Sequence, residues 1–368
     1  MKRSGRSRQL LNLGRAALAC AASMLLAGLF LLSPVSAQQS PVLHLAPTAL
    51  SGDPACQTLT PTGAGGPAPK DPVVVLRWLG NANYELAYRD NVILLDAHYD
   101  RSALNHPIGV AAKDFKKANA ILIGHAHSDQ ISDAASVAKQ TGAMVIGASL
   151  SADVVRKQGV PEAQIKTVKG MGEEFKFTGF TVRAILGHHD VLPQDYMDKI
   201  SAASAAVALI PVNGKEQPPE MTAAQKQEAD AIAARGSTDP KIIEEGTIGC
   251  LFNFDNGFRL MWVDSAGPLT DEQHRLAEQF PTIDVGLFPL YGMDMAVPLT
   301  MEYVRLFHPA IMMPTAHDGA PGSGFDEPTV PVFLKIRDEL PRTKTYAPLY
   351  RTPLCVNTMT KQSFVSNK

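Results

Sequence analysis

The sequence has few cysteines and no excess of basic residues. The first feature limits the kinds of metal ligand, and the second limits the kinds of binding partner. None of the four cysteines in 368 residues is spaced as C-x-x-C, so a bound metal must rely on histidine and carboxylate ligands. The 34 basic and 36 acidic side chains give a net charge of −2, which would not replace the counterions of a polyanion. We therefore expect no nucleic-acid partner.

The beginning of the chain has the pattern of an export signal. A positively charged start precedes an apolar stretch over residues 16–32, and small residues suit cleavage after residue 37. No twin-arginine pair is present, and an uncleaved membrane anchor is the alternative, because the stretch approaches spanning length. We expect residues 1–37 to be a cleaved signal peptide, leaving a periplasmic or secreted chain without a stable membrane span. In such an oxidising compartment Cys56 and Cys355 could form a disulfide.

The rest of the chain divides into three parts. Residues 38–71 are rich in Pro and Gly without periodicity and form an N-terminal segment, not a domain. Residues 72–350 alternate predicted strands and helices, which is typical of a layered α/β domain, and residues 351–368 are predicted to be a C-terminal tail. A partly helical insertion around 191–245 breaks the alternation; it is a lid over the site, a surface excursion or an oligomer contact. The oligomeric state is left open.

The central motif of the domain is the segment 120–133, AILIGHAHSDQISD. Its apolar start ends at Gly124, which indicates a buried strand that runs into a loop. His125, His127 and Asp129 then occupy every second position. In an extended loop alternate side chains project to one side, so two imidazoles and a carboxylate would meet where a metal such as zinc could bind. A polar surface loop with two histidines is the alternative.

Three further predicted strands end in the same kinds of side chain. Taken singly, the histidines could be surface residues and the aspartate a helix N-cap, but four such strand ends together predict a metal centre. An earlier strand closes with Asp96, which either orients a ligand or forms a turn. The additional candidates are His188 and His189 after strand 180–186, Asp264 after strand 258–263, and His317 after strand 310–316.

With these motifs the chain resembles the metallo-β-lactamase-fold hydrolase superfamily over roughly residues 73–350. Within it, Trp78-Leu79-Gly80, Leu94-Leu95-Asp96 and Pro314-Thr315-Ala316-His317 resemble the branch of ascorbate-6-phosphate lactonases and N-acyl-phosphatidylethanolamine phospholipases D. The resemblance implies a four-layer αββα sandwich with metals at one edge, where the strands end. It also implies zinc, as one or two ions, with manganese or iron as alternatives.

The same resemblance implies a ligand set. The first metal would be held by His125 and His127 together with one histidine of the pair 188–189, and His189 is preferred over His188 because ligands lie a few residues beyond the strand. The second metal would be held by Asp129 and His317, with Asp264 bridging both ions.

Two positions depart from the superfamily pattern. Gln130 stands where the signature HxHxDH has its final histidine, and an amide oxygen is a weaker zinc ligand, so the second site is weakened, prefers a harder metal or is empty. In addition, Gly80-Asn81-Ala82-Asn83 lacks the histidine that often follows the first glycine in this branch. The number of ions and the usual substrate contacts therefore stay open.

The implied activity is hydrolysis. A metal lowers the pKa of bound water from about 15.7 towards 7, and Asp129 would orient this nucleophile and move its proton. We expect an exported hydrolase of a small ester, lactone or amide. The alternatives are a phosphodiesterase of the same fold and a non-catalytic binding protein with a degraded second site. Tyr291, Met293 and Met295 are candidates for the wall of an apolar pocket.

Overall fold

The computed structural model describes residues 52–102, 105–190, 222–290, 297–315, 317–318 and 329–365. These belong to one compact unit, residues 45–368. The signal peptide and the pocket candidates Tyr291, Met293 and Met295 lie outside the described residues, so they stay predictions. No helix within the described ranges has the length and apolar character needed to cross a bilayer.

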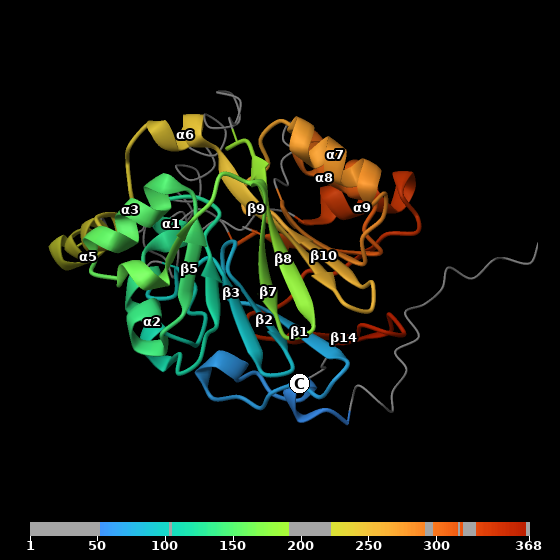
Figure 1. Ribbon diagram of the computed structural model, residues 1–368, viewed down its shortest axis with the longest axis horizontal. Helices are drawn as coiled ribbons and strands as arrows, with labels where there is room; N and C mark the ends of the chain where they lie inside the picture. Colours follow the sequence, from blue (N-terminus) through green and yellow to red (C-terminus); the bar gives the residue numbers. More distant parts are fainter. Residues whose placement is uncertain are drawn as a thin grey trace, which may run out of the picture. The chain divides into compact units, whose positions relative to one another are not determined.

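Two mixed sheets contain most of the strands (Figure 1). The first has the order β15-β14-β1-β2-β3-β4-β5-β6 and the second the order β13-β12-β11-β10-β9-β8-β7. The strands of the first sheet are β1 (Val73–Trp78), β2 (Tyr84–Tyr88), β3 (Asn91–Leu95), β4 (Ala120–Leu122), β5 (Met144–Gly147), β6 (Ile165–Thr167), β14 (Pro353–Asn357) and β15 (Ser363–Val365). Those of the second are β7 (Met171–Phe177), β8 (Phe180–Gly187), β9 (Thr247–Phe254), β10 (Arg259–Trp262), β11 (Val285–Pro289), β12 (Ile311–Thr315) and β13 (Lys344–Thr345).

The sheets pack face to face, and helices cover their outer faces. Side chains such as Leu86 of the first sheet and Phe252 of the second share one buried cluster between the sheets. In Figure 1 helices α2 and α3 flank the first sheet, whereas α7, α8 and α9 flank the second. The described helices are α1 (Ser128–Ile131), α2 (Ala134–Thr141), α3 (Ser149–Lys157), α5 (Ala223–Ala233), α6 (Lys241–Glu245), α7 (Asp271–Gln279), α8 (Val297–Phe307) and α9 (Thr329–Glu339), with 3-10 turns at Pro54–Cys56, Thr62–Ala64, Ala112–Asp114 and Glu162–Gln164.

This arrangement is the predicted four-layer αββα sandwich, and burial explains its apolar strands. Leu122 of β4 faces the cluster between the sheets, while its neighbour Ile121 packs in the cluster beneath α2 and α3. A strand that is covered on both faces has a continuous apolar sequence instead of an alternating one. Within the predicted partly helical insertion, the described helix α5 has no buried residue.

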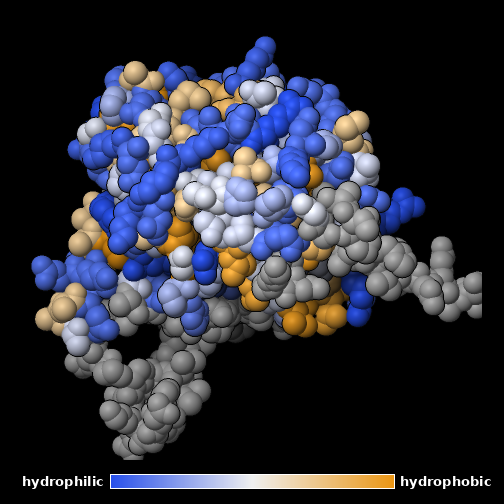
Figure 2. Space-filling view, turned by 90° about the horizontal axis from the view of Figure 1, so that it is seen from below, coloured by the Kyte–Doolittle hydropathy of each residue, from blue (hydrophilic) through white to orange (hydrophobic). Residues whose placement is uncertain are grey.

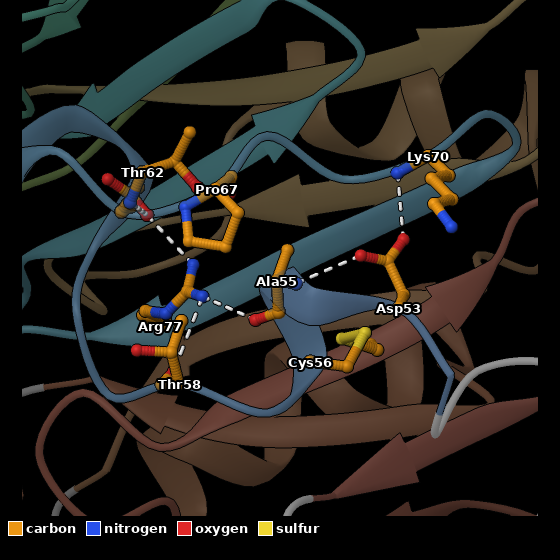
Figure 3. The surroundings of a disulfide bond; sticks show 10 residues. Asp53, Ala55, Cys56, Thr58, Thr62, Pro67, Lys70 and Arg77 are labelled. Carbon is orange, nitrogen blue, oxygen red and sulfur yellow. Dashed lines mark hydrogen bonds and ion pairs between the residues drawn. A yellow bond between two sulfur atoms is a disulfide. The ribbon is translucent and has the colours of Figure 1, made fainter.

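The two ends of the domain are joined more closely than the sequence predicts. Residues assigned to a C-terminal tail form β14, which lies between β15 and β1, and its register pairs Cys355 with Val75. A short apolar run that begins with proline is a weak strand signal on its own, because proline cannot donate to the ladder. Cys355 is disulfide-bonded to Cys56, so the N-terminal segment is fixed to the outer side of β1 and β14 (Figure 3).

Candidate metal centre

The metal-binding loop begins where β4 ends. The loop stays extended as far as His127, whose φ and ψ are −65° and 152°, and α1 begins directly after it. The sequence predicts an extended loop through Asp129, and this is wrong for the last two residues because the chain is already helical from Ser128. His125 and His127 therefore point to one side, while Asp129 starts from a turn of helix.

Three histidines converge at this loop. The ligand atoms of His125, His127 and His189 all lie within 4.8 Å of one another, and no other such group of His, Cys, Asp or Glu occurs among the residues that the structure describes. His127 Nδ1 lies 2.9 Å from His125 Nε2 and 3.3 Å from His189 Nε2. Each pair of rings is nearly perpendicular, at 82–87°. Three imidazole nitrogens from two sheets thus surround one point, as a zinc-like ion requires.

The structure separates the two adjacent histidines at the end of β8. His189 joins the three-histidine group, whereas His188 is exposed and its Nδ1 lies 2.8 Å from the carbonyl oxygen of Pro268. This placement agrees with the preference for His189 as the ligand.

Asp264, at the end of β10, lies directly behind His125. Its Oδ2 accepts a 2.5 Å hydrogen bond from His125 Nδ1, which leaves Nε2 of this histidine directed at the other two. The second carboxylate oxygen is buried and has no hydrogen-bond partner. A Cβ atom at position 124 would overlap this carboxylate. Gly124 is therefore needed for the Asp264 side chain to lie where it does. An unsatisfied buried oxygen beside three imidazoles fits a site for a divalent cation.

We expect Asp264→Asn to weaken zinc binding about 10- to 100-fold, because a partner that orients a ligating histidine contributes this much to metal affinity. Competition with a chromophoric chelator measures the dissociation constant. Asp271→Asn, which changes an exposed aspartate in the first turn of α7, is the matched control and should leave the affinity unchanged. Equal affinities in both variants would contradict the role of Asp264.

The electrostatics around the group differ between His127 and His189. Burial, together with the nearby charge of His125, lowers the pKa of His127 to about 4, so at neutral pH it is in the form that binds metals. Burial alone would lower the pKa of His189, but its hydrogen bond to Asp190 outweighs this effect and raises it. Asp96 has a positive φ of 56°, and its carboxylate accepts a hydrogen bond from the Gly124 amide, so its orienting and turn-forming roles both stay open.

Asp129 lies beside the histidines in a network of amides. Its Oδ2 accepts hydrogen bonds from Asn81 Nδ2 at 3.2 Å and from Gln130 Nε2 at 3.1 Å. Asn81 also donates to the backbone oxygen of Asp129, at 2.8 Å. In the sequence, the segment around Asn81 is notable only because it lacks the histidine that often follows the first glycine. The hydrogen bonds of Asn81 to Asp129 were therefore not predicted.

His317 follows β12 and is stacked against Trp78. The two ring centroids are 3.9 Å apart with an interplanar angle of 21°. Burial lowers the pKa of His317 to about 4, and its Nδ1 has no hydrogen-bond partner. The next residue, Asp318, forms an ion pair of 2.5 Å with Arg101, and both side chains are almost fully buried. Nothing in the sequence indicates that residues 101 and 318 pair.

The structure places a three-histidine group that could hold a metal ion at the strand ends of a four-layer αββα sandwich. Comparison with known proteins agrees. No protein-family model matches the sequence. The chain is 34% identical over 92 residues to a UPF0173 metal-dependent hydrolase of Pyrobaculum islandicum. These residues cover 24% of this chain and 39% of that protein. Over 74 residues it is 34% identical to one of Thermococcus onnurineus, covering 20% of this chain and 31% of the relative.

Solved structures are similar over a larger part of the chain. Igni18, a metallo hydrolase of Ignicoccus hospitalis, aligns with a TM-score of 0.51 and 16% identity over 77% of this chain and 98% of that chain. The protein thus has the metallo-β-lactamase-type fold, and its relatives are named metal-dependent hydrolases. The chain spans only 31–39% of the length of these two curated relatives.

Proposed function

We propose that the protein is an exported metal-dependent hydrolase that acts on a small, uncharged ester, lactone or amide. The observation that carries this proposal is the convergence of His125, His127 and His189 at the strand ends. These three side chains would hold a divalent ion, for which zinc is the first choice and manganese or iron are alternatives. When bound, such an ion supplies a water-derived nucleophile at neutral pH and polarises the bond to be broken.

The chain's own groups would prepare the reaction around that ion. Asp264 holds His125 in the orientation that directs Nε2 inward. Asp129 accepts hydrogen bonds from two amides and is thereby positioned beside the histidines, where it would orient the attacking water and accept its proton. Neither role depends on a second metal ion.

A cavity beside the site supports an apolar substrate. It has a volume of about 550 Å³, and its lining includes His317 and Trp78 but none of the three histidines of the group. Asn81 accepts a hydrogen bond from Trp78 Nε1 and donates one to Asp129. A cavity of this size suits a small molecule. Its lining is mainly aliphatic and aromatic and consists of Trp78, His106, Pro107, His317, Asp318, Thr329, Ala347, Pro348, Leu349 and Tyr350.

The charges at this cavity favour an uncharged substrate over a phosphodiester. Asp318 at the cavity wall forms an ion pair with Arg101. The Arg101 guanidinium is therefore already paired and would not bind the phosphate of a phosphodiester. Burial keeps His317 neutral by lowering its pKa to about 4. Of the two activities that the sequence resemblance implies, these charges therefore favour that of a lactonase over that of a phospholipase.

The test is a substrate panel with purified mature protein. Lactone, ester, amide and phosphodiester substrates are assayed before and after removal of metal with a chelator, and again after zinc is restored. Chelator-sensitive turnover of a lactone, ester or amide is the expected result. A protein that binds zinc but turns over none of these would be a binding protein, and preferential cleavage of the phosphodiester would reverse the choice between substrates.

Leu349 gives a direct test of the cavity. Its side chain is 77% exposed at the rim of the cavity, so Leu349→Asp should leave folding intact while placing a charge against an apolar substrate. We expect KM to rise about tenfold, which corresponds to about 1.4 kcal/mol of binding, with kcat unchanged. Leu334→Asp is the control, because Leu334 on α9 is 45% exposed and does not line the cavity. Equal KM values for both variants would place the substrate elsewhere.

Export is also part of the proposal. The disulfide between Cys56 and Cys355 supports it, because such bonds persist in oxidising compartments and are rare in the cytosol. Fractionation of cells that express the full-length chain, followed by mass spectrometry of the mature N-terminus, tests it. Cleavage after residue 37 is expected.

A further inference from the structure

A distant segment of the chain, residues 235–237, contacts the backbone of the metal-binding loop. The amide of Ser237 donates to the carbonyl oxygen of Ala126 at 2.8 Å. Among the residues that the structure describes, this is the only backbone hydrogen bond that joins residues 125–128 to a segment beyond α1. Because Ala126 stands between two histidines of the group, the bond fixes the stretch of backbone that carries both imidazoles.

Gly236 brings the two backbones into direct contact. A Cβ atom at position 236 would lie 2.4 Å from the amide nitrogen of Ser128 and 2.5 Å from its Cα. Both are backbone atoms, so an alanine here would force the segment and the loop apart instead of moving a side chain. Ser128 is the first residue of α1 and follows His127 directly. The segment therefore lies against the loop at the point where the helix begins.

Arg235 holds the segment in place through a buried carboxylate. Its Nη1 donates to Oδ1 of Asp133 at 2.7 Å, and the Asp133 side chain is fully buried. The other oxygen of Asp133 accepts from the amides of Tyr99 and Asp100, at 2.6 and 2.8 Å. The carbonyl oxygen of Arg235 accepts from Nε2 of Gln158, directly after α3, at 2.8 Å. Arg235 is thus fixed at both its side chain and its backbone.

These residues end the insertion, for which the sequence leaves three roles open. Helix α5 lies beside α1 (Figure 1), and the amides of Arg235 and Gly236 close its last turn by donating to the carbonyls of Ile232 and Ala233. Because α5 buries no residue of its own, a hydrophobic face does not explain its position. The contacts of residues 235–237 do.

We propose that residues 235–237 form a clamp that keeps the metal-binding loop in its ligating shape before an ion binds, with Arg235 as a positioning residue. The guanidinium sets the clamp against the loop, while Gly236 and the Ser237 amide fix the backbone between the two histidines. A site that is already ordered binds its ligand more tightly, because less conformational freedom is lost on binding. The inference rests on the proposed metal centre and gives the end of the insertion a role in it.

The closing experiment compares the zinc affinities of Arg235→Gln and Arg305→Gln. Both changes remove an arginine from an ion pair, but Arg305 pairs with Glu339 at the surface of α8. In competition with a chromophoric chelator, Arg235→Gln should bind zinc about tenfold more weakly, the lower end of the range for groups that support a metal ligand. Arg305→Gln should bind as the original protein does. Arg235→Lys keeps a positive charge beside Asp133 and should recover most of the affinity.

Hydrogen exchange of the chelator-treated protein provides a readout that does not involve zinc. Peptides that cover residues 120–133 should exchange faster in Arg235→Gln and in Gly236→Ala than in the original protein. Thr238→Ala, at an exposed neighbouring position, is the control and should not change the exchange. Circular dichroism verifies that each variant is folded.

The results separate the clamp from the metal centre itself. If Arg235→Gln were less stable to urea but bound zinc with the original affinity, the residue would have only a structural role and the inference would be overturned. Unchanged exchange in both Arg235→Gln and Gly236→Ala would overturn it as well. Either result would leave the hydrolase proposal intact, whereas an original protein that bound no zinc would remove the proposed function and the inference together.

Discussion

Replacing His189 with alanine is expected to abolish stoichiometric zinc binding and to reduce hydrolysis at least about a thousandfold. The three imidazoles are mutually within 4.8 Å, and a site left with two nitrogens lacks the ligand number of a catalytic zinc site. Loss of the ion removes several kcal/mol of transition-state stabilisation, and about 4 kcal/mol corresponds to a thousandfold in rate. Zinc content and kcat/KM are the two measurements.

The neighbouring histidine provides the control. His188→Ala changes the same residue type one position earlier, but His188 is exposed and contacts the Pro268 carbonyl on another side of the chain. Zinc content and kcat/KM should remain within about twofold of the original protein. If His188→Ala lost the metal and His189→Ala kept it, the assignment of the third ligand would be reversed.

The layered fold could be predicted because most strands carry a local signal. Segments such as Ile121-Leu122 are apolar on both faces, and in the structure both faces are covered. The turn Asp255-Asn256-Gly257 is likewise a local signal for a hairpin, and in the structure it joins the paired strands β9 and β10. Ligands at the strand ends followed from the same patterns, since a strand that stops at His or Asp delivers that side chain to the edge of the sheet.

The interactions that the sequence did not reveal connect distant positions. Asn81 and Asp318 are 237 residues apart, yet the Asn81 amide donates to the Asp318 carboxylate. Arg101 pairs with Asp318 over a separation of 217 residues. Such contacts depend on how the two sheets and their loops pack against each other. No local sequence pattern predicts this packing. The start of α1 directly after His127 was missed for a different reason, since a four-residue helix has too little periodicity to detect.

Replacing Glu85 with glutamine should lower the free energy of unfolding by about 3–5 kcal/mol, because it leaves a buried guanidinium without its counter-charge. Arg77 and Glu85 face each other on β1 and β2 with fully buried side chains, 3.0 Å apart. The two carboxylate oxygens of Glu85 also accept from the amides of Thr62 and Gly63. Arg77 donates to the carbonyl oxygen of Ala55 (Figure 3). Urea unfolding with the disulfide intact measures the loss.

The N-terminal segment depends on this pair because Glu85 accepts from the amides of Thr62 and Gly63 and Arg77 donates to the carbonyl of Ala55. The surface shown in Figure 2 is mainly hydrophilic with separate hydrophobic patches. An exposed ion pair makes a fair comparison with the buried one. Glu162→Gln breaks such a pair, with Arg156, and should cost at most about 1 kcal/mol. If Glu85→Gln were no more destabilising than Glu162→Gln, the segment would be held by the Cys56–Cys355 bond alone, and reduction of that bond should then release it.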